Sequence, residues 1–202
     1  MKTRKDMRQK KNTSKAACRP DKTEIDLSHA YRLLYPMHTV LVSCCGKTGG
    51  PNIITLSWVM PTSIKPPLVA ISVAPNRHSH ALIKESREFV VNIPTFSLLK
   101  DTLFCGTVSG KDHDKFKETG LTSLASRMVK APFIMECIAH LECKLCGEFN
   151  TGDHTLFIGE IIAAYANKGA FGTVYDTRIA PILLELGGNK FAIPDRRVIK
   201  FQ

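Results

Sequence analysis

Two apolar runs on either side of a turn decide the fold, HTVLVSCC at residues 38–45 and NIITLSWVM at residues 52–60. Both runs are rich in β-branched residues, which favour extended strands. The segment between them, GKTGGP at residues 46–51, is a cluster of turn residues that ends the first run. The sequence therefore predicts a β-hairpin over residues 38–60.

Working outward from this hairpin, the chain remains dominated by strands. Short apolar pieces occur at 179–186 and 191–193, and strands are predicted at 68–74, 89–93, 138–149 and 155–165, the last two joined by a turn at Gly152 and Asp153. Helices are predicted at 79–87 and 95–104, and the polar segment 109–120 is helix-capable and ends at Gly120. Strands and helices do not alternate as in βαβ units, so the fold class is mainly β, a closed or partly closed barrel of Greek-key type with flanking helices.

The positive charge of the chain is concentrated at its N-terminus. The 202 residues carry a net charge of +10, and residues 1–22 hold nine of the 28 basic side chains against Asp6 and Asp21. We expect residues 1–25 to be a flexible basic tail and residues 26–202 to form one domain. No aromatic residue interleaves these charges, so we expect no nucleic-acid partner. Without an apolar run of about 18 residues or a secretory signal, a cytoplasmic protein with no membrane contact is expected.

Several common motifs are excluded. Gly46-Lys47-Thr48 is not a phosphate loop, because Leu41 stands where that motif needs glycine, and no G-x-G-x-x-G, G-x-S-x-G or H-E-x-x-H occurs. The seven cysteines are an odd number, which favours reduced thiols over a disulfide framework. Cys143 and Cys146 lack the second pair that a zinc site needs, so no metal is expected and Cys143 is interpreted as a buried strand residue.

Hydroxyl, amide and cationic residues gather at the ends of strands and the starts of helices. These types can hold a phosphorylated planar cofactor, because hydroxyls and helix amides bind phosphate while Arg or Lys neutralises it. They are Thr55, Ser57, Ser63, Arg77, Ser79, Asn92, Ser109 and Lys115. Each one alone fits a turn or a helix cap equally well, so composition by itself indicates only a soluble β-rich domain.

A series of short sequence strings, taken in order, indicates a family. YPMHTVLVS (35–43), GPNIITLSW (50–58), SIKPP (63–67), RHSH (77–80), EFVVNIP (88–94), CGTVSG (105–110), DKF (114–116) and GDH (152–154) occur in this order. The succession resembles the flavin reductase-like family of FMN-binding split β-barrels, particularly its flavoredoxin and archaeal ferric reductase-like branch. The resemblance covers about residues 31–193.

The resemblance implies a homodimer with one FMN per subunit, bound near the subunit interface. It implies that Asn52, Thr55, Ser57 and Trp58 border the flavin ring, and that Ser72, Arg77 and Ser79 lie near the phosphate and ribityl chain, with Lys115 adding positive charge. Asn92, Cys105, Ser109 and His154 would line the same pocket, and Phe191 would cover the flavin. No catalytic side chain is implied beyond the flavin itself.

Two classes of function follow from this resemblance. The leading hypothesis is an FMN-dependent oxidoreductase or electron carrier, which takes electrons from NAD(P)H or a reduced electron-transfer protein. The acceptor would be a flavin, a ferric complex or another protein. The alternative is a non-catalytic binding module, either a barrel that binds FMN or haem or, less favoured, a nucleic-acid binder that uses its basic tail.

Overall fold

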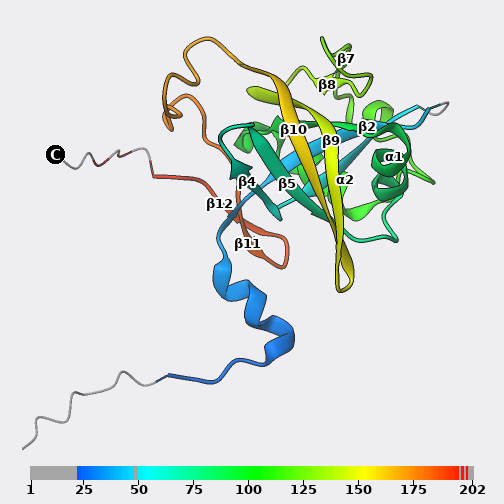
Figure 1. Ribbon diagram of the computed structural model, residues 1–202. Helices are drawn as coiled ribbons and strands as arrows, with labels where there is room; N and C mark the ends of the chain where they lie inside the picture. The colour runs from blue at the N-terminus through cyan, green and yellow to red at the C-terminus, as the bar shows by residue number, and fades with distance from the viewer. Residues whose placement is uncertain (1–21, 48–49, 196, 198, 200–202) are drawn as a thin grey trace, which may run out of the picture.

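A computed structural model describes residues 22–47, 50–195, 197 and 199. Most of the expected basic tail, residues 1–21, and Thr48 and Gly49 of the expected turn lie outside these residues. The described chain is built around a seven-stranded antiparallel sheet with the order β3-β2-β6-β9-β10-β5-β4 (Figure 1). The strands are β2 (Val40–Cys45), β3 (Pro51–Leu56), β4 (Val59–Ser63), β5 (Leu68–Val73), β6 (Glu88–Ile93), β9 (Ala139–Thr151) and β10 (His154–Ala166).

The predicted hairpin is present, but its second run is two strands rather than one. β3 pairs with β2 from Val40↔Leu56 to Cys45↔Pro51, whereas β4 pairs with β5 at the other edge of the sheet. Ser57 and Trp58 alone connect β3 to β4, and the Trp58 carbonyl accepts a hydrogen bond from the Ser72 amide at 3.0 Å. The single strand expected over 52–60 is therefore wrong, because the chain must change partners at Ser57–Trp58 to bring the two edges of the sheet together.

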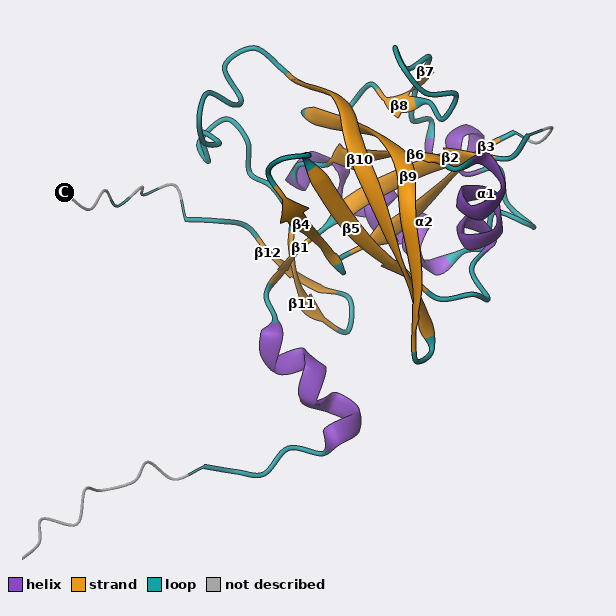
Figure 2. Ribbon diagram, viewed as in Figure 1, coloured by secondary structure: helices purple, strands orange, loops and turns teal. Residues whose placement is uncertain are grey.

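The topology agrees with the mainly β class predicted from the sequence. β5 lies beside β10, and β9 and β6 follow in the sheet, so four strands have the order of a Greek key. The long hairpin of β9 and β10 extends beyond the rest of the barrel in Figures 1 and 2. Gly152, with a φ of 77°, lies in its turn as expected.

Helices lie beside the barrel rather than between successive parallel strands (Figure 2). They are α1 (His78–Ser86), the 3-10 turn η2 (Phe96–Leu98), α2 (Leu99–Thr107) and α3 (Lys115–Thr119). The helical expectation for 109–120 is wrong for its first half, where the amides of Asp112 and His113 both bond to the Ser109 carbonyl in a turn. Gly120 caps α3 with a φ of 75°, as its position predicted.

Smaller elements complete the described chain. β1 (Met37–His38), β11 (Leu184–Gly187) and β12 (Lys190–Ala192) form a three-stranded sheet, and β7 (Ser123–Leu124) pairs with β8 (Phe133–Ile134). The 3-10 helix η1 (Leu27–Leu34) projects below the barrel in Figure 1 and buries none of its residues, but its Tyr31 ring lies 5.6 Å from the ring of Trp58. The sequence patterns did not predict this helix.

The barrel interior holds the largest apolar cluster. Val42, Ile71, Phe89 and Phe157 are completely buried there. Phe89 packs so closely on β10 that a Cβ on Gly159 would lie 2.5 Å from its ring, which explains the glycine. None of the helices within the described ranges is long and apolar enough to cross a membrane.

The cysteines follow the strand periodicity. Cys44 packs into the interior cluster whereas its neighbour Cys45 packs into a separate one, so the two thiols point to opposite faces of β2. Cys143 is fully buried, as predicted, and Cys146 is exposed. Neither Cys44 with Cys45 nor Cys143 with Cys146 therefore places two thiols side by side on one face of its strand.

Candidate functional site

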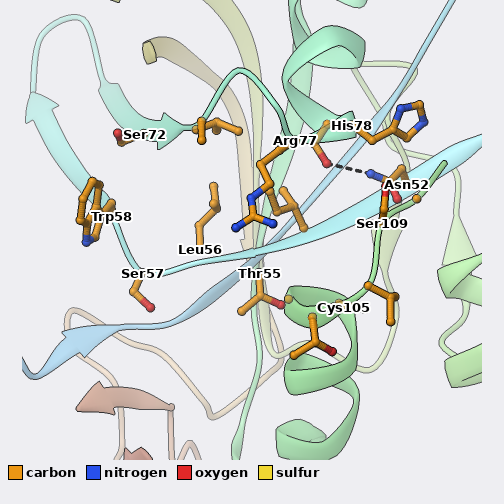
Figure 3. Close-up of a pocket in the computed structure, with 18 of the residues that line it drawn as sticks. Asn52, Thr55, Leu56, Ser57, Trp58, Ser72, Arg77, His78, Cys105 and Ser109 are labelled. Atoms are coloured by element: carbon orange, nitrogen blue, oxygen red, sulfur yellow. Dashed lines mark hydrogen bonds between the residues drawn. The ribbon is translucent and has the colours of Figure 1, made fainter. Parts of the chain in front are cut away.

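A cavity of about 300 Å³ lies between helices α1 and α2 and the barrel seam, which is the Ser57–Trp58 connection that joins the two edges of the sheet. This volume is at the lower end of the range for small-molecule sites. Its wall is formed by β3, the Ser57–Trp58 connection, the end of β5, the start of α1, the end of α2 and the 108–110 loop. Single residues complete the wall: Tyr35, Lys115 of α3, His154 of β10 and Glu185 of β11. Figure 3 shows β3 crossing the floor of this cavity, with side chains from the other elements directed toward it.

The start of α1 forms one end of the cavity. Arg77 occupies the N-cap position and makes no capping hydrogen bond with its side chain, so the first-turn amides are not capped by this residue. Its guanidinium instead reaches over β3 toward Thr55 and Leu56 (Figure 3). Ser79 is buried in the first turn and its Oγ accepts a hydrogen bond from Asn52 Nδ2 at 2.7 Å. Uncapped helix amides, a hydroxyl and a guanidinium together favour an anionic group at this end.

Lys115 adds a second, buried positive charge. Only 4% of its surface is exposed, and its Nζ donates to the carbonyl oxygens of Ile53 at 2.8 Å and Cys105 at 2.7 Å. Burial lowers the pKa of this ammonium group, but the two carbonyls satisfy two of its three donors. Lys115 therefore ties α3 to β3 and α2 while it lines the cavity.

Close backbone approach shapes the same wall. A Cβ on Gly110 would lie 2.1 Å from Oδ1 of Asn52, and one on Gly106 would lie 3.2 Å from Cβ of Thr55. Thr55 Oγ1 also donates to the carbonyl oxygen of Thr102 at 2.6 Å, which fixes α2 against β3. The loop after α2 can thus come this close to β3 only because position 110 lacks a side chain.

Aromatic side chains form the opposite end of the cavity. Trp58 Nε1 donates to Tyr35 Oη at 3.3 Å, and the Trp58 ring lies 4.8 Å from the His154 ring, tilted by 40°. His154 Nδ1 lies 2.8 Å from Oδ1 of Asp153 in the β9–β10 turn. Next to them, Ser57 Oγ donates to a carboxylate oxygen of Glu185 on β11. This end offers flat apolar surface with a hydroxyl and a carboxylate at its margin.

The structure brings together eleven of the thirteen residues expected at the site. They are Asn52, Thr55, Ser57, Trp58, Ser72, Arg77, Ser79, Cys105, Ser109, Lys115 and His154. Cys105 contributes as a neutral wall residue, because burial raises the pKa of its thiol to about 11.

Asn92 does not line this cavity, which corrects the expectation. It is completely buried, its Nδ2 donates to the Leu41 carbonyl and to Ser43 Oγ, and its Oδ1 accepts from the Ile134 amide and from His140 Nδ1. The strand register places this side chain against the segment that leads into β9, away from the seam. Its polarity serves a structural network.

Phe191 is also absent from the cavity wall. In the described chain it lines a different and smaller hollow, of about 230 Å³, with Phe96, Leu99 and Leu103. Phe191 lies on β12 directly opposite Glu185 of β11. Of this pair, Glu185 lines the cavity instead.

Sequence reasoning missed Tyr35 and Glu185 as wall residues. Tyr35 belongs to one of the strings that carry the resemblance, which was the available signal for it. Glu185 gave no signal, because it reaches Ser57 only after the C-terminal hairpin has paired with β1 at Met37↔Glu185. A contact between residues 57 and 185 depends on tertiary structure alone.

Comparison with known proteins identifies the class. Residues 31–183 match the model of the flavin reductase like domain. An uncharacterized protein of Archaeoglobus fulgidus is 46% identical over 129 residues, which cover 64% of this chain and 72% of that protein. The structure of flavoredoxin from Methanosarcina acetivorans superposes with a TM-score of 0.79 at 27% identity, covering 89% of this chain and 95% of the other. An NADH-dependent FAD reductase of Streptomyces globisporus is 28% identical over 138 residues, covering 64% of this chain and 70% of that enzyme.

The fold and the site thus define a split-barrel protein with a cavity suited to a phosphorylated planar ligand. The chain belongs to the flavin reductase-like family, because the family model matches more than half of its length. This confirms the family and the fold class expected from the sequence, and it supports the expectation of a flavin cofactor, FMN.

Proposed function

We propose that this chain binds FMN in the seam cavity and transfers electrons through it. The observation that carries the proposal is the polarity of the cavity, with cationic and hydroxyl groups at the α1 end and aromatic surface at the Trp58 end. FMN has the same division, because a dianionic phosphate and a planar ring lie at its opposite ends. The residues of the cavity therefore fit the cofactor of the family.

In this arrangement each end of the cavity has a distinct task. Arg77, Ser79 and the first-turn amides of α1 would bind the phosphate, and the buried charge of Lys115 would add to the attraction. Trp58, held by Tyr35, would support the ring, and Asn52, Thr55 and Ser109 would contact the chain between the two ends. Bound FMN supplies the redox chemistry, while the protein supplies binding, orientation and electrostatics.

The partners of this reaction belong to the proposal as well. The leading donors are NAD(P)H and a reduced electron-transfer protein, and the acceptors are a free flavin, a ferric complex or another protein. The family membership and the similarity to an NADH-dependent FAD reductase support an oxidoreductase.

Two measurements on the full-length protein test the proposal in sequence. The visible spectrum of the purified, undialysed protein should show oxidised flavin near one per subunit, directly or after FMN is added and the excess removed. Anaerobic addition of NADH or NADPH should then bleach the flavin if the protein is a reductase. Bleaching only by a reduced ferredoxin-like donor would favour a carrier, and bleaching by neither would favour the non-catalytic module.

We also propose that the chain works as a homodimer. η1 exposes three leucines to solvent, Leu27 at 89%, Leu33 at 70% and Leu34 at 75%, and the helix buries none of its residues in the described chain. Packing on a second subunit would remove this apolar surface from water. Light scattering should give the mass of a dimer, and a double L33D/L34D variant should shift it toward the monomer if η1 forms part of the contact.

A further inference from the structure

Glu185 is the acidic side chain that lines the cavity in the described chain. It lies beside Ser57 at the aromatic end, whereas Arg77 is at the start of α1, near Asn52 and Ser79. Asn52 and Ser57 are five residues apart along β3 and its end, which corresponds to about 16 Å of extended chain. The cavity therefore has positive charge at one end and a negative charge at the other.

The position of this carboxylate is fixed by backbone pairing. Glu185 pairs with Met37 of β1 on one side and with Phe191 of β12 on the other. Its Oε2 accepts the hydrogen bond of Ser57 Oγ, and Ser57 is itself buried. A residue held by two neighbouring strands and a buried hydroxyl has little freedom to turn away from the cavity.

In the described chain Glu185 forms no ion pair, although it acts on one nearby cation, Arg32 of η1, whose pKa its charge helps to raise after a larger effect of Tyr31. No salt bridge within the described ranges includes it. The negative charge of Glu185 acts on the aromatic end of the cavity: burial and, to a smaller extent, this charge raise the pKa of Tyr35. An unpaired carboxylate acts over several ångströms in a partly buried site.

We propose that Glu185 sets the redox balance of the bound flavin by placing this negative charge at the ring end of the cavity. The inference rests on the proposed function, in which the phosphate lies at Arg77 and the ring lies toward Trp58. Reduction adds two electrons to the flavin ring, and when only one proton accompanies them the ring gains one negative charge. Repulsion from Glu185 then weakens binding of the reduced form relative to the oxidised form and lowers the reduction potential.

The test compares E185Q with the wild type by measuring dissociation constants for oxidised and for dithionite-reduced FMN. The same proteins are then titrated against indicator dyes to obtain the midpoint potential. In E185Q the reduced form should bind about tenfold better relative to the oxidised form, since one unit charge is removed. For a two-electron couple a tenfold change corresponds to a rise of about 30 mV in the midpoint potential.

Two further variants separate charge from structure. E185D keeps the negative charge and should retain a potential close to that of the wild type. E160Q makes the same substitution at an exposed glutamate on β10 and should change neither constant. If E185Q weakens both redox forms equally, Glu185 holds β11 in place but does not set the potential, and the inference is overturned.

Failure of the inference is distinguishable from failure of the proposed function. If the wild type binds no FMN, both are overturned. If the wild type binds FMN and E185Q leaves the ratio of the two dissociation constants unchanged, only the role of Glu185 is overturned.

Discussion

Replacing Asn92 with alanine should lower the free energy of unfolding of the protein without weakening its binding of FMN. Asn92 is completely buried, and its Oδ1 accepts hydrogen bonds from the Ile134 amide at 3.0 Å and from His140 Nδ1 at 2.9 Å. Both donors belong to buried residues. The N92A variant would leave these two donors without their partner in the barrel wall.

The expected magnitude follows from the cost of unsatisfied buried groups. Each buried donor that loses its partner costs about 1–3 kcal/mol. Two such donors predict a loss of about 2–6 kcal/mol in the free energy of unfolding, a large fraction of the roughly 5–15 kcal/mol that stabilises most proteins. The affinity for FMN should stay within about twofold, because Asn92 does not line the seam cavity.

Urea denaturation without added FMN measures the first quantity, since bound ligand would otherwise contribute to the apparent stability. Fluorescence titration with FMN at a temperature where the variant remains folded measures the second. N167A, which removes an exposed asparagine side chain, is the matched control and should behave as the wild type. A loss of more than tenfold in FMN affinity with unchanged stability would refute the reasoning and return Asn92 to the binding site.

Three further predictions concern the cavity and the buried histidine. R77A should weaken FMN binding by about 10–100-fold, because a charge-assisted contact to phosphate is lost, and leave riboflavin binding unchanged; an equal loss for both ligands in fluorescence titrations would contradict it. G110A places a Cβ 2.1 Å from Oδ1 of Asn52, so overpacking should lower the free energy of unfolding by about 1–3 kcal/mol and weaken FMN binding, whereas an unchanged melting temperature would argue against the close approach. Burial lowers the pKa of His140 from 6.5 to about 4, so on acidification the histidine of the unfolded chain binds a proton before that of the folded chain does. The free energy of unfolding should therefore be highest above pH 6.5 and fall by up to about 3 kcal/mol as the pH approaches 4. Urea midpoints that stay constant from pH 7 to 4.5, with the His140 ring followed by NMR, would show that the histidine is not buried in its neutral form.

The strands were largely predictable because their side-chain periodicity is local. The runs at 38–45, 138–149 and 155–165 became β2, β9 and β10 with shifts of a few residues at their ends. The break at Ser57–Trp58 was not predictable in the same way. Nothing in NIITLSWVM interrupts the strand pattern, and the chain bends there only because its two halves pair with opposite edges of the sheet.

The sites of Asn92 and Glu185 show the same limit. Both are polar residues on strands, and the sequence assigned the first to the cavity and overlooked the second. Their positions depend on which neighbour each strand finds, β2 and β9 for Asn92 and β1 and β12 for Glu185. A one-residue difference in register moves a side chain to the other face of its sheet.

The sequence by itself determined the strand content, the exclusion of phosphate-loop and Rossmann motifs, the family resemblance and most of the groups that surround the cavity. These follow from residue types and spacings within a few positions of each other. Only the tertiary structure decided that the ends of β3 and β4 close the barrel, that Asn92 supports a buried network, and that Glu185 completes the aromatic end. The physical reason is that pairing between distant strands, and not local preference, determines which polar side chains meet in the folded chain.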